Sequence, residues 1–473
     1  MGLRTFAERV LPLSDLKPLK KIKSGFFDRS LSLTRFAVQS GASLAFNSLK
    51  GLLTDADTRD LQFKLLLEAQ AKLLSKELGN LKGSLMKVGQ MLALYGEHFL
   101  PEEVVKSLKT LNEQSQAVAW TEINKLIKKR LSADLLAELE IDPNPLAAAS
   151  MGQVHRATIK ATGEQICLKI QYPGVDKAID SDVKTLRSIL GLFKFIPSQG
   201  EGYNQLFQEI RTMLHQELDY NRELAFTEEA KRLLQDQSEF IVPTCFARYS
   251  GKRILATRYE AGVNLDSLEV QSLSQERRNR LGVLFSKLFI QELFDFRLMQ
   301  TDPHFGNYKI LIRADGLDQI ILLDWGAVRT FREDFTRNYR LILDGAMTQN
   351  KAKMIQGGTA IGFLRPDDPL SLQDSFAEIS SVAVEPWLAP VDPRVPSALV
   401  DGKGCFLWSR SDLPSRITQL ATRYALTFKM RPPPREVLFL DRKIGGVFII
   451  LKILDARFEG HKLLAEHLNS IKT

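Results

Sequence analysis

Cysteine is scarce in this sequence: its 473 residues contain Cys167, Cys245 and Cys405, which lie far apart. An odd number of distant cysteines excludes a small scaffold held together by disulfides and favours reduced thiols in a cytosol-like compartment. The CxxC spacing of a structural zinc site is also absent. Neither disulfides nor structural zinc are therefore expected to stabilise the chain.

Long apolar runs are absent as well, since no stretch reaches the roughly 18 residues that cross a bilayer. The best candidate, residues 445–451, is soon followed by Lys452 and Asp455, so we expect a buried helix there. Glu8 and Pro12 interrupt any apolar region of a secretory signal. We therefore expect a cytoplasmic protein without a transmembrane span, whose membrane contact, if any, is peripheral.

Charge of one sign does not dominate. The chain has 64 Lys and Arg against 56 Asp and Glu, which gives a net charge of +8. This balance is compatible with an anionic ligand, a negative membrane surface or nucleic acid, and selects none of them. The chain has no RNA-binding signature and no Cys/His finger, so nucleic acid is not an expected partner. The hydrophobic content of 44% and charged content of 25% are typical of a soluble globular protein.

Hydrophobic periodicity divides the chain into four expected regions. Residues 1–54 form a basic leader, typical of a solvated segment or of one that lies on an anionic membrane surface. Residues 55–140 have helical spacing, and residues 141–262 combine strands with inserted helices. Residues 263–473 are mainly helical.

Within these regions we expect both strands and long helices. The expected strands cover residues 147–159, 164–171, 240–248, 252–259, 308–313 and 318–324. The expected long helices cover residues 175–194, 203–236 and 272–297. A strand-rich part followed by a helix-rich part predicts an α+β fold in two lobes.

An acidic motif in the helix-rich part is the first candidate site. Asp302 and Asn307 lie five residues apart in a polar loop, and Asp324 follows the apolar segment 320–323. A carboxylate at the end of such a buried strand is costly unless it is paired or bound to metal. Oxygen ligands of this kind suit Mg²⁺, and the spacing is that of a kinase catalytic loop. Taken alone, Asp324 could equally cap a helix or form a salt bridge, and His304 is more typical of loop packing.

A second candidate is the strand 164–171. Alternation places Lys169 on the face opposite its apolar residues, as expected for a surface lysine or for an ammonium that contacts nucleotide phosphates. The segment 145–155 before it contains Ala147, Ala148, Ala149 and Ser150 where a phosphate-binding turn normally has glycines. By itself this segment reads as a strand edge.

Two helical stretches carry further candidates. On a single helix over 203–236, Glu217 falls within an apolar stripe, whereas Asp219 and Glu223 lie on the opposite side. An acid within an apolar stripe usually has a buried partner, although a partly exposed Glu217 is the plain alternative. Lys87 and Gln90 are three residues apart and share a helix face, which in isolation is typical of an exposed surface.

Taken in order, these pieces resemble the UbiB/AarF family of atypical protein-kinase-like proteins over about residues 80–460. The resemblance rests on a KxGQ motif, an Ala-rich loop, an ICLKIQYPGV segment, an ExD motif, a D-P-H-x-x-N loop and a DFG-like triplet. In that order, the residues that carry it are Lys87, Gly89 and Gln90; Ala147–Ser150; Lys169; Glu217 and Asp219; Asp302 and Asn307; and Asp324–Gly326. The family implies a two-lobed protein-kinase-like fold with an N-terminal helical extension.

The resemblance also implies roles for these residues. Lys169 would contact the phosphates of ATP or ADP near the Ala-rich loop and pair with Glu223. Asp302 would be the catalytic-loop aspartate, and Asn307 and Asp324 would hold Mg²⁺. Lys87 and Gln90 would fold over the cleft and meet Glu217 and Asp219, which would obstruct a protein substrate.

The resemblance implies an ATPase or atypical kinase that supports the metabolism of ubiquinone or of another isoprenoid lipid. The partners implied are a nucleotide, an anionic membrane surface or isoprenoid lipid, and lipid-biosynthesis proteins. Trp325 replaces the Phe of a DFG triplet, and an expected helix near residue 331 leaves no room for a conventional activation loop. Two alternatives remain open at this point. One is a small-molecule phosphotransferase, which does not explain Lys87 and Gln90, and the other is a catalytically idle nucleotide- or lipid-binding scaffold.

Overall fold

The computed structural model describes most of the chain from residue 84 onward. The described residues are 65, 68–69, 71–75, 78, 84–95, 100, 102–108, 117–192, 201–428 and 434–469. The expected basic leader, residues 1–54, lies outside them. Two compact units are present, one within Met1–Ala225 and Thr244–Tyr259 and the other within Phe226–Pro243 and Glu260–Thr473.

The first unit contains a four-stranded antiparallel sheet in the order β1-β2-β3-β5. Its strands are β1 Leu139–Ala148, β2 Gly152–Ile159, β3 Gln165–Gln171 and β5 Ile254–Arg258. The single strand expected over 147–159 is wrong, because a turn closed by a hydrogen bond from Ala149 N to Gly152 O separates β1 from β2. On β3 the alternation is confirmed, since Ile166, Leu168 and Ile170 are buried and Lys169 faces the other way.

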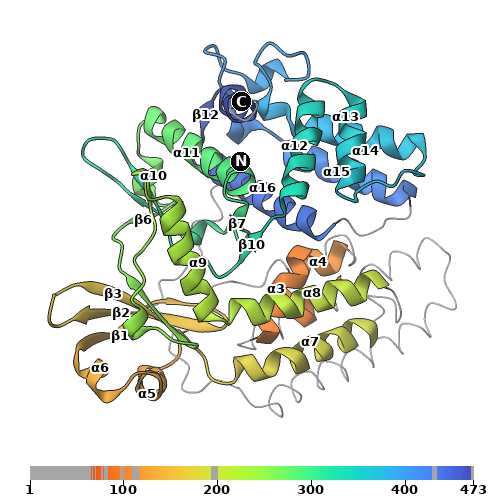
Figure 1. Cartoon of the computed structure of the whole chain (residues 1–473). Helices are drawn as coiled ribbons and strands as arrows, with labels where there is room; N and C mark the ends of the chain where they lie inside the picture. Colours follow the sequence, from red (N-terminus) through yellow and green to blue (C-terminus); the bar gives the residue numbers. More distant parts are fainter. Residues whose placement is uncertain are drawn as a thin grey trace. The chain divides into compact units, whose positions relative to one another are not determined.

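Helices make up the rest of the first unit. They are α3 Ser84–Tyr95, α4 Glu102–Leu108, α5 Trp120–Arg130, α6 Ala133–Ala137, α7 Val175–Leu192 and α8 Glu201–Glu217, followed by α9 Tyr220–Leu233, which begins here and runs into the second unit. Helix α3 packs against both α7 and α8 (Figure 1).

The single helix expected over 203–236 is wrong. The chain breaks between α8 and α9 at Leu218–Asp219, where the Asp219 carboxylate accepts hydrogen bonds from the backbone N–H groups of Asn221 and Arg222 at 3.2 and 3.3 Å. A capped new helix does not continue the rotation of the previous one, so a helical wheel drawn through both misplaces the residues after the break. The wheel put Glu223 opposite the apolar stripe, yet Glu223 is buried.

The second unit contains a four-stranded sheet in the order β4-β9-β8-β6 and two smaller antiparallel ladders, β7–β10 and β11–β12. Its strands are β4 Phe240–Ile241, β6 Val263–Asn264, β7 Leu298–Gln300, β8 Tyr308–Leu311, β9 Gln319–Leu322, β10 Val328–Thr330, β11 Phe406–Leu407 and β12 Arg457–Phe458. The strand expected over 240–248 is therefore much shorter, and β4 pairs in parallel with β9.

The helices of the second unit pack around a continuous apolar core (Figure 1). They are α10 Leu268–Gln271, α11 Gln275–Phe294, α12 Glu333–Met347, α13 Lys351–Ala360, α14 Leu370–Ala383, α15 Leu413–Phe428, α16 Arg435–Ile453 and α17 Gly460–Asn469. Together the two units confirm the α+β class.

The apolar run 445–451 is confirmed as part of a buried helix. Val447, Phe448, Ile450 and Leu451 of α16 all lie in the core. Among the helices that the structure describes, none combines the length and apolar character needed to cross a membrane.

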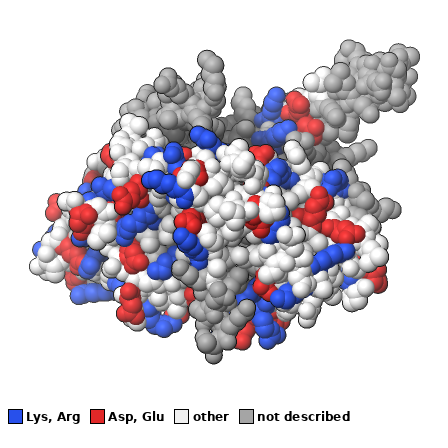
Figure 2. Space-filling model, turned by 90° about the horizontal axis from the view of Figure 1, so that it is seen from above, with Lys and Arg blue, Asp and Glu red and all other residues white. Residues whose placement is uncertain are grey.

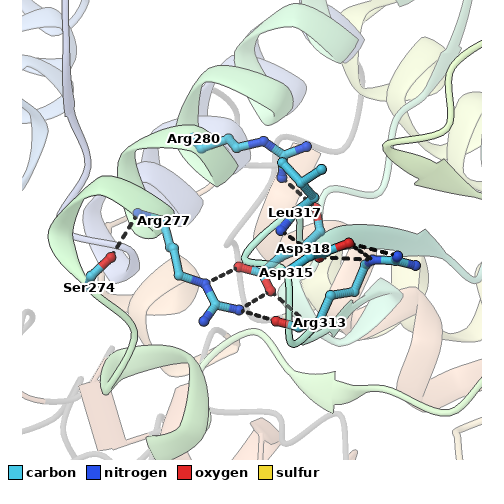
Figure 3. Close-up of polar contacts among 7 residues, drawn as sticks. All are labelled: Ser274, Arg277, Arg280, Arg313, Asp315, Leu317 and Asp318. Atoms are coloured by element: carbon cyan, nitrogen blue, oxygen red, sulfur yellow. Dashed lines mark hydrogen bonds and ion pairs between the residues drawn. The ribbon is translucent and has the colours of Figure 1, made fainter.

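A buried carboxylate ties the β8–β9 turn to helix α11 (Figure 3). The Arg277 guanidinium donates to both oxygens of Asp318, one of them at 2.8 Å, and Arg280 donates to the Asp318 carbonyl at 2.7 Å. The backbone N–H of Arg313 donates to the same carboxylate at 3.0 Å. The Asp318 side chain is only 1% exposed and that of Arg277 is 27% exposed, so the carboxylate is buried while the guanidinium reaches the surface.

We expect Asp318→Ala to destabilise the second unit more than Asp315→Ala does, because Asp318 is buried and accepts hydrogen bonds from both α11 and the turn. Asp315→Ala removes only the exposed partner of Arg313, and exposed ion pairs contribute little. Urea unfolding followed by tryptophan fluorescence can measure both, since Trp325, Trp387 and Trp408 belong to the second unit. Equal unfolding midpoints for the two variants would contradict this assignment.

Candidate functional site

Lys169 and Glu223 form a two-point ion pair in the first unit. The Lys169 ammonium on β3 donates to both carboxylate oxygens of Glu223 on α9, at 2.7 and 2.9 Å. The Glu223 side chain is 4% exposed and that of Lys169 is 29% exposed, so the acid is buried and the ammonium reaches the surface. The Tyr220 ring lies 5.3 Å from the same ammonium. The buried acid thus fixes the direction of a cation that solvent can reach.

The Ala-rich segment lies in the hairpin turn beside this pair. Ala147 and Ala148 end β1, Ala149 and Ser150 form the turn, and Gly152 begins β2. Only glycine fits at 152, because a Cβ there would lie 2.9 Å from both Ile170 O and the Tyr220 hydroxyl. The close approach of β2 to β3 and α9 therefore depends on Gly152. The phosphate-binding role of Ala147–Ser150 stays a prediction.

A second ion pair joins α3 to α8 in the same unit. The Lys87 ammonium lies 2.7 Å from a carboxylate oxygen of Glu217, and the two side chains are 21% and 26% exposed. Gln90 lies on α3 three residues further on, and its side chain is half-buried. Glu217 and Glu223 do serve different lysines, as the sequence suggested, but the cause is the helix break at Asp219 rather than two faces of one helix.

In the second unit, backbone pairing brings the three acidic-motif segments together. Thr301 N donates to Ala327 O at 2.9 Å, which extends the β7–β10 ladder to the residue before Asp302. Leu323 N donates to Asn307 O at 3.0 Å, which extends the β8–β9 hairpin to the residue before Asp324. The loop with Asp302 and the segment that starts at Asp324 are thus held at both ends by short ladders.

The Asp302 carboxylate is held from two sides. Asn307 Nδ2 donates to the Asp302 backbone carbonyl at 2.8 Å and to Oδ2 at 3.3 Å, while Gln300 Nε2 donates to the same carbonyl at 2.7 Å. The Arg442 guanidinium, from α16, donates to Oδ1. Sequence reasoning missed Arg442, because 140 residues separate it from Asp302 and no motif contains it.

The oxygen atoms of Asn307 and Asp324 fit a hard cation. The Asn307 amide nitrogen is engaged with Asp302, which leaves its carbonyl oxygen as the donor atom for a metal. Asp324 Oδ1 accepts a hydrogen bond from Gly326 N at 2.8 Å, which orients its carboxylate. Within the described ranges, no cluster of three or more His, Cys, Asp or Glu side chains could hold a metal ion. A cation here would therefore take its remaining ligands from phosphate and water, as Mg²⁺ commonly does.

Two smaller expectations about this loop are confirmed. His304 Nδ1 accepts a hydrogen bond from Gly306 N at 3.1 Å and its ring stacks on Phe305, so it packs within the loop. Between Gly326 and the start of α12 at Glu333, the only regular element is the three-residue strand β10. This connection is too short for a conventional activation loop.

We expect Glu223→Gln to lower the stability of the first unit by about 1–3 kcal/mol, because it weakens two charge-assisted hydrogen bonds at a buried site. Glu217→Gln should cost less than about 1 kcal/mol, since both members of that pair are partly exposed. Thermal unfolding of the two variants checks the order, and a larger loss for Glu217→Gln would contradict it.

Comparison with known proteins gives consistent findings. The family model described as the ABC1 atypical kinase-like domain matches residues 110–357, slightly more than half of the chain. The chain is 29% identical over 446 residues to the rat protein "Atypical kinase COQ8B, mitochondrial", covering 94% of this chain and 80% of the relative. It is 28% identical over 403 residues to the Saccharomyces cerevisiae protein "Atypical kinase COQ8, mitochondrial", covering 85% and 77%.

The fold also matches a solved structure. The chain of "The complex structure of Rv3197-erythromycin from Mycobacterium tuberculosis" superposes with a TM-score of 0.56 at 23% identity, covering 86% of this chain and 98% of that chain. This likeness supports the fold alone. Together with the family model, it confirms the kinase-like fold that the sequence predicted.

Proposed function

Because this chain belongs to the ABC1 atypical kinase-like family, the UbiB family of atypical kinases, we propose that it is a Mg²⁺-dependent ATPase or atypical kinase. Its proposed role is to support ubiquinone or related isoprenoid-lipid metabolism. The observation that carries the proposal is the assembly of Asp302, Asn307 and Asp324 by two short ladders. The Lys169–Glu223 pair supports it independently.

Each residue has a role that follows from its surroundings. The Lys169 ammonium, directed by Glu223, binds phosphate oxygens of ATP or ADP. Asn307 and Asp324 would hold Mg²⁺ through oxygen, and the cation would neutralise negative charge on the phosphates. Asp302 orients the attacking hydroxyl, because one of its carboxylate oxygens can accept the proton that this hydroxyl loses.

The phosphoryl acceptor is proposed to be water or a small molecule rather than a protein. The short connection between Gly326 and α12 argues against regulation by phosphorylation of an activation loop and does not bear on the acceptor. Lys87 is held against α8 by Glu217, and we propose that this pair, together with Gln90 and Asp219, restricts access of a protein substrate.

The proposed working environment is an anionic membrane surface or an isoprenoid lipid, with lipid-biosynthesis proteins as partners. The relatives named COQ8 and COQ8B are mitochondrial by their names. Over the described residues visible in Figure 2, basic and acidic side chains are interspersed, so that face does not present one sign of charge. A membrane contact through that face would depend on apolar as well as electrostatic attraction.

We expect Asp324→Asn to abolish the stabilisation that Mg²⁺-ATP gives, because it removes a charged oxygen ligand of the metal. For the wild type this stabilisation should be about 2.7 kcal/mol at a ligand concentration 100 times Kd. A thermal-shift titration measures it. Asp344→Asn, which changes a partly exposed ion pair in the same unit, is the matched control. Unchanged nucleotide affinity in Asp324→Asn would count against the metal assignment.

We expect Asp302→Asn to reduce ATP hydrolysis by about 100-fold, the scale of a lost general base. Anionic liposomes should stimulate the wild type and leave this variant at its reduced rate. The assay measures phosphate release with and without liposomes.

Transfer of phosphate to a soluble alcohol would instead identify a small-molecule phosphotransferase. Full complementation of a null strain by Asp302→Asn would identify a catalytically idle scaffold.

A further inference from the structure

Helix α16 lies beyond residue 357, where the match to the family model ends, yet it packs against the proposed catalytic segments. Arg435, Phe439, Arg442 and Gly446 are spaced by four, three and four residues, so they share one face of the helix. Arg442 and Gly446 contact the loop that holds Asp302, and Phe439 contacts Arg329 of β10.

Gly446 is the closest contact. A Cβ at this position would lie 2.1 and 2.3 Å from Cγ and Cβ of Pro303, the residue that follows Asp302. Real Cβ atoms do not approach so closely, so the helix backbone packs directly on the loop only because residue 446 is glycine. The neighbouring Gly445 has no atom within 4 Å of the corresponding position. The requirement for glycine therefore comes from the loop and not from the helix itself.

Arg442, one turn before Gly446, pairs with the Asp302 carboxylate. The Arg442 and Asp302 side chains are 18% and 27% exposed, so the pair is shielded from most of the solvent. Arg442 engages Oδ1 and Asn307 engages Oδ2. The two donors together fix the plane of the carboxylate.

The rotation of α16 is fixed by contacts next to this pair. Lys443 is 2% exposed, and its ammonium lies 2.6 Å from the equally buried Glu292 carboxylate of α11. Phe439 is buried, with the Arg329 guanidinium 4.8 Å from its ring centre. Arg329 belongs to β10, so α16 contacts the loop that holds Asp302 and also the strand that follows the Asp324–Gly326 triplet.

We propose that α16 is part of the catalytic centre and that Arg442 is a positioning residue for phosphoryl transfer. This inference rests on the proposed function. In ATP hydrolysis, a water oxygen bonds to the γ-phosphorus. The bond between that phosphorus and the β–γ bridging oxygen breaks, and ADP leaves with the bridging oxygen. The proton lost by the water passes to the Asp302 carboxylate, whose orientation Arg442 and Gly446 maintain.

The test compares Arg442→Met and Gly446→Ala with two matched controls, Gly445→Ala and Arg423→Met. Arg423 pairs with Glu378 at an exposed site of the same unit. We expect kcat for ATP hydrolysis to fall about 100-fold in Arg442→Met and Gly446→Ala, the scale of a 1 Å displacement, with KM changed less than about threefold. Both controls should keep wild-type kcat. Arg442→Lys should recover part of the activity, since it restores the charge without the planar guanidinium.

Hydrogen exchange of residues 301–307 gives a readout that does not depend on activity. We expect faster exchange in Arg442→Met and Gly446→Ala, and no change in the controls. Wild-type kcat in Arg442→Met would overturn the inference. It would also be overturned if kcat, nucleotide affinity and melting temperature fell together in both Arg442→Met and Arg442→Lys, because the helix would then be merely structural.

The two proposals fail in different ways. If the wild type hydrolyses no ATP and transfers no phosphate, the proposed function fails and the catalytic role of Arg442 fails with it. If the wild type is active, and Arg442→Met and Gly446→Ala are as active as the wild type, only the role of α16 is overturned.

Discussion

Backbone pairing between short strands is the constraint on which the proposed chemistry depends. Asp302, Asn307 and Asp324 are polar residues on loops, and nothing in their own conformations would keep them together. The β7–β10 ladder fixes the loop at its start, and the β8–β9 hairpin fixes its end. Because strand register is set residue by residue, the hydrogen bond between Leu323 and Asn307 places Asn307 next to Asp324. Ligands for one cation can in this way come from two separate segments.

In the first unit, the buried carboxylate of Glu223 holds the Lys169 side chain in place. A carboxylate removed from water is stable only if it is paired, and Glu223 is paired through both oxygens with Lys169. The cost of burying the acid is offset by a lysine that keeps its own end accessible. The break between α8 and α9 is what allows this arrangement, since it lets Glu217 and Glu223 face different lysines.

Helix α16 is largely apolar but carries the charged residues Arg442 and Lys443 on the side that packs against the rest of the second unit. Lys443 and Glu292 pair within the core, where burial raises the pKa of the Glu292 carboxyl and the nearby ammonium opposes that shift. Removing either partner alone would leave a buried charge, so the pair fixes how the helix is rotated. That rotation in turn directs Arg442 toward Asp302 and Gly446 toward Pro303.

Four features could be predicted from the amino-acid sequence alone: the α+β class, the alternation that singles out Lys169, the buried helix at 445–451 and the order of the motifs. These features are local, since they follow from hydrophobic period and from spacing over a few residues. The structure adds the turn after Ala148, the break at Asp219 and the contact between Arg442 and Asp302. The turn and the break are closed by local hydrogen bonds that a search for hydrophobic period overlooks, whereas the contact depends on a partner that approaches from 140 residues away. Local periodicity carries no information about such a partner, because the energy of the contact arises only when the two segments meet.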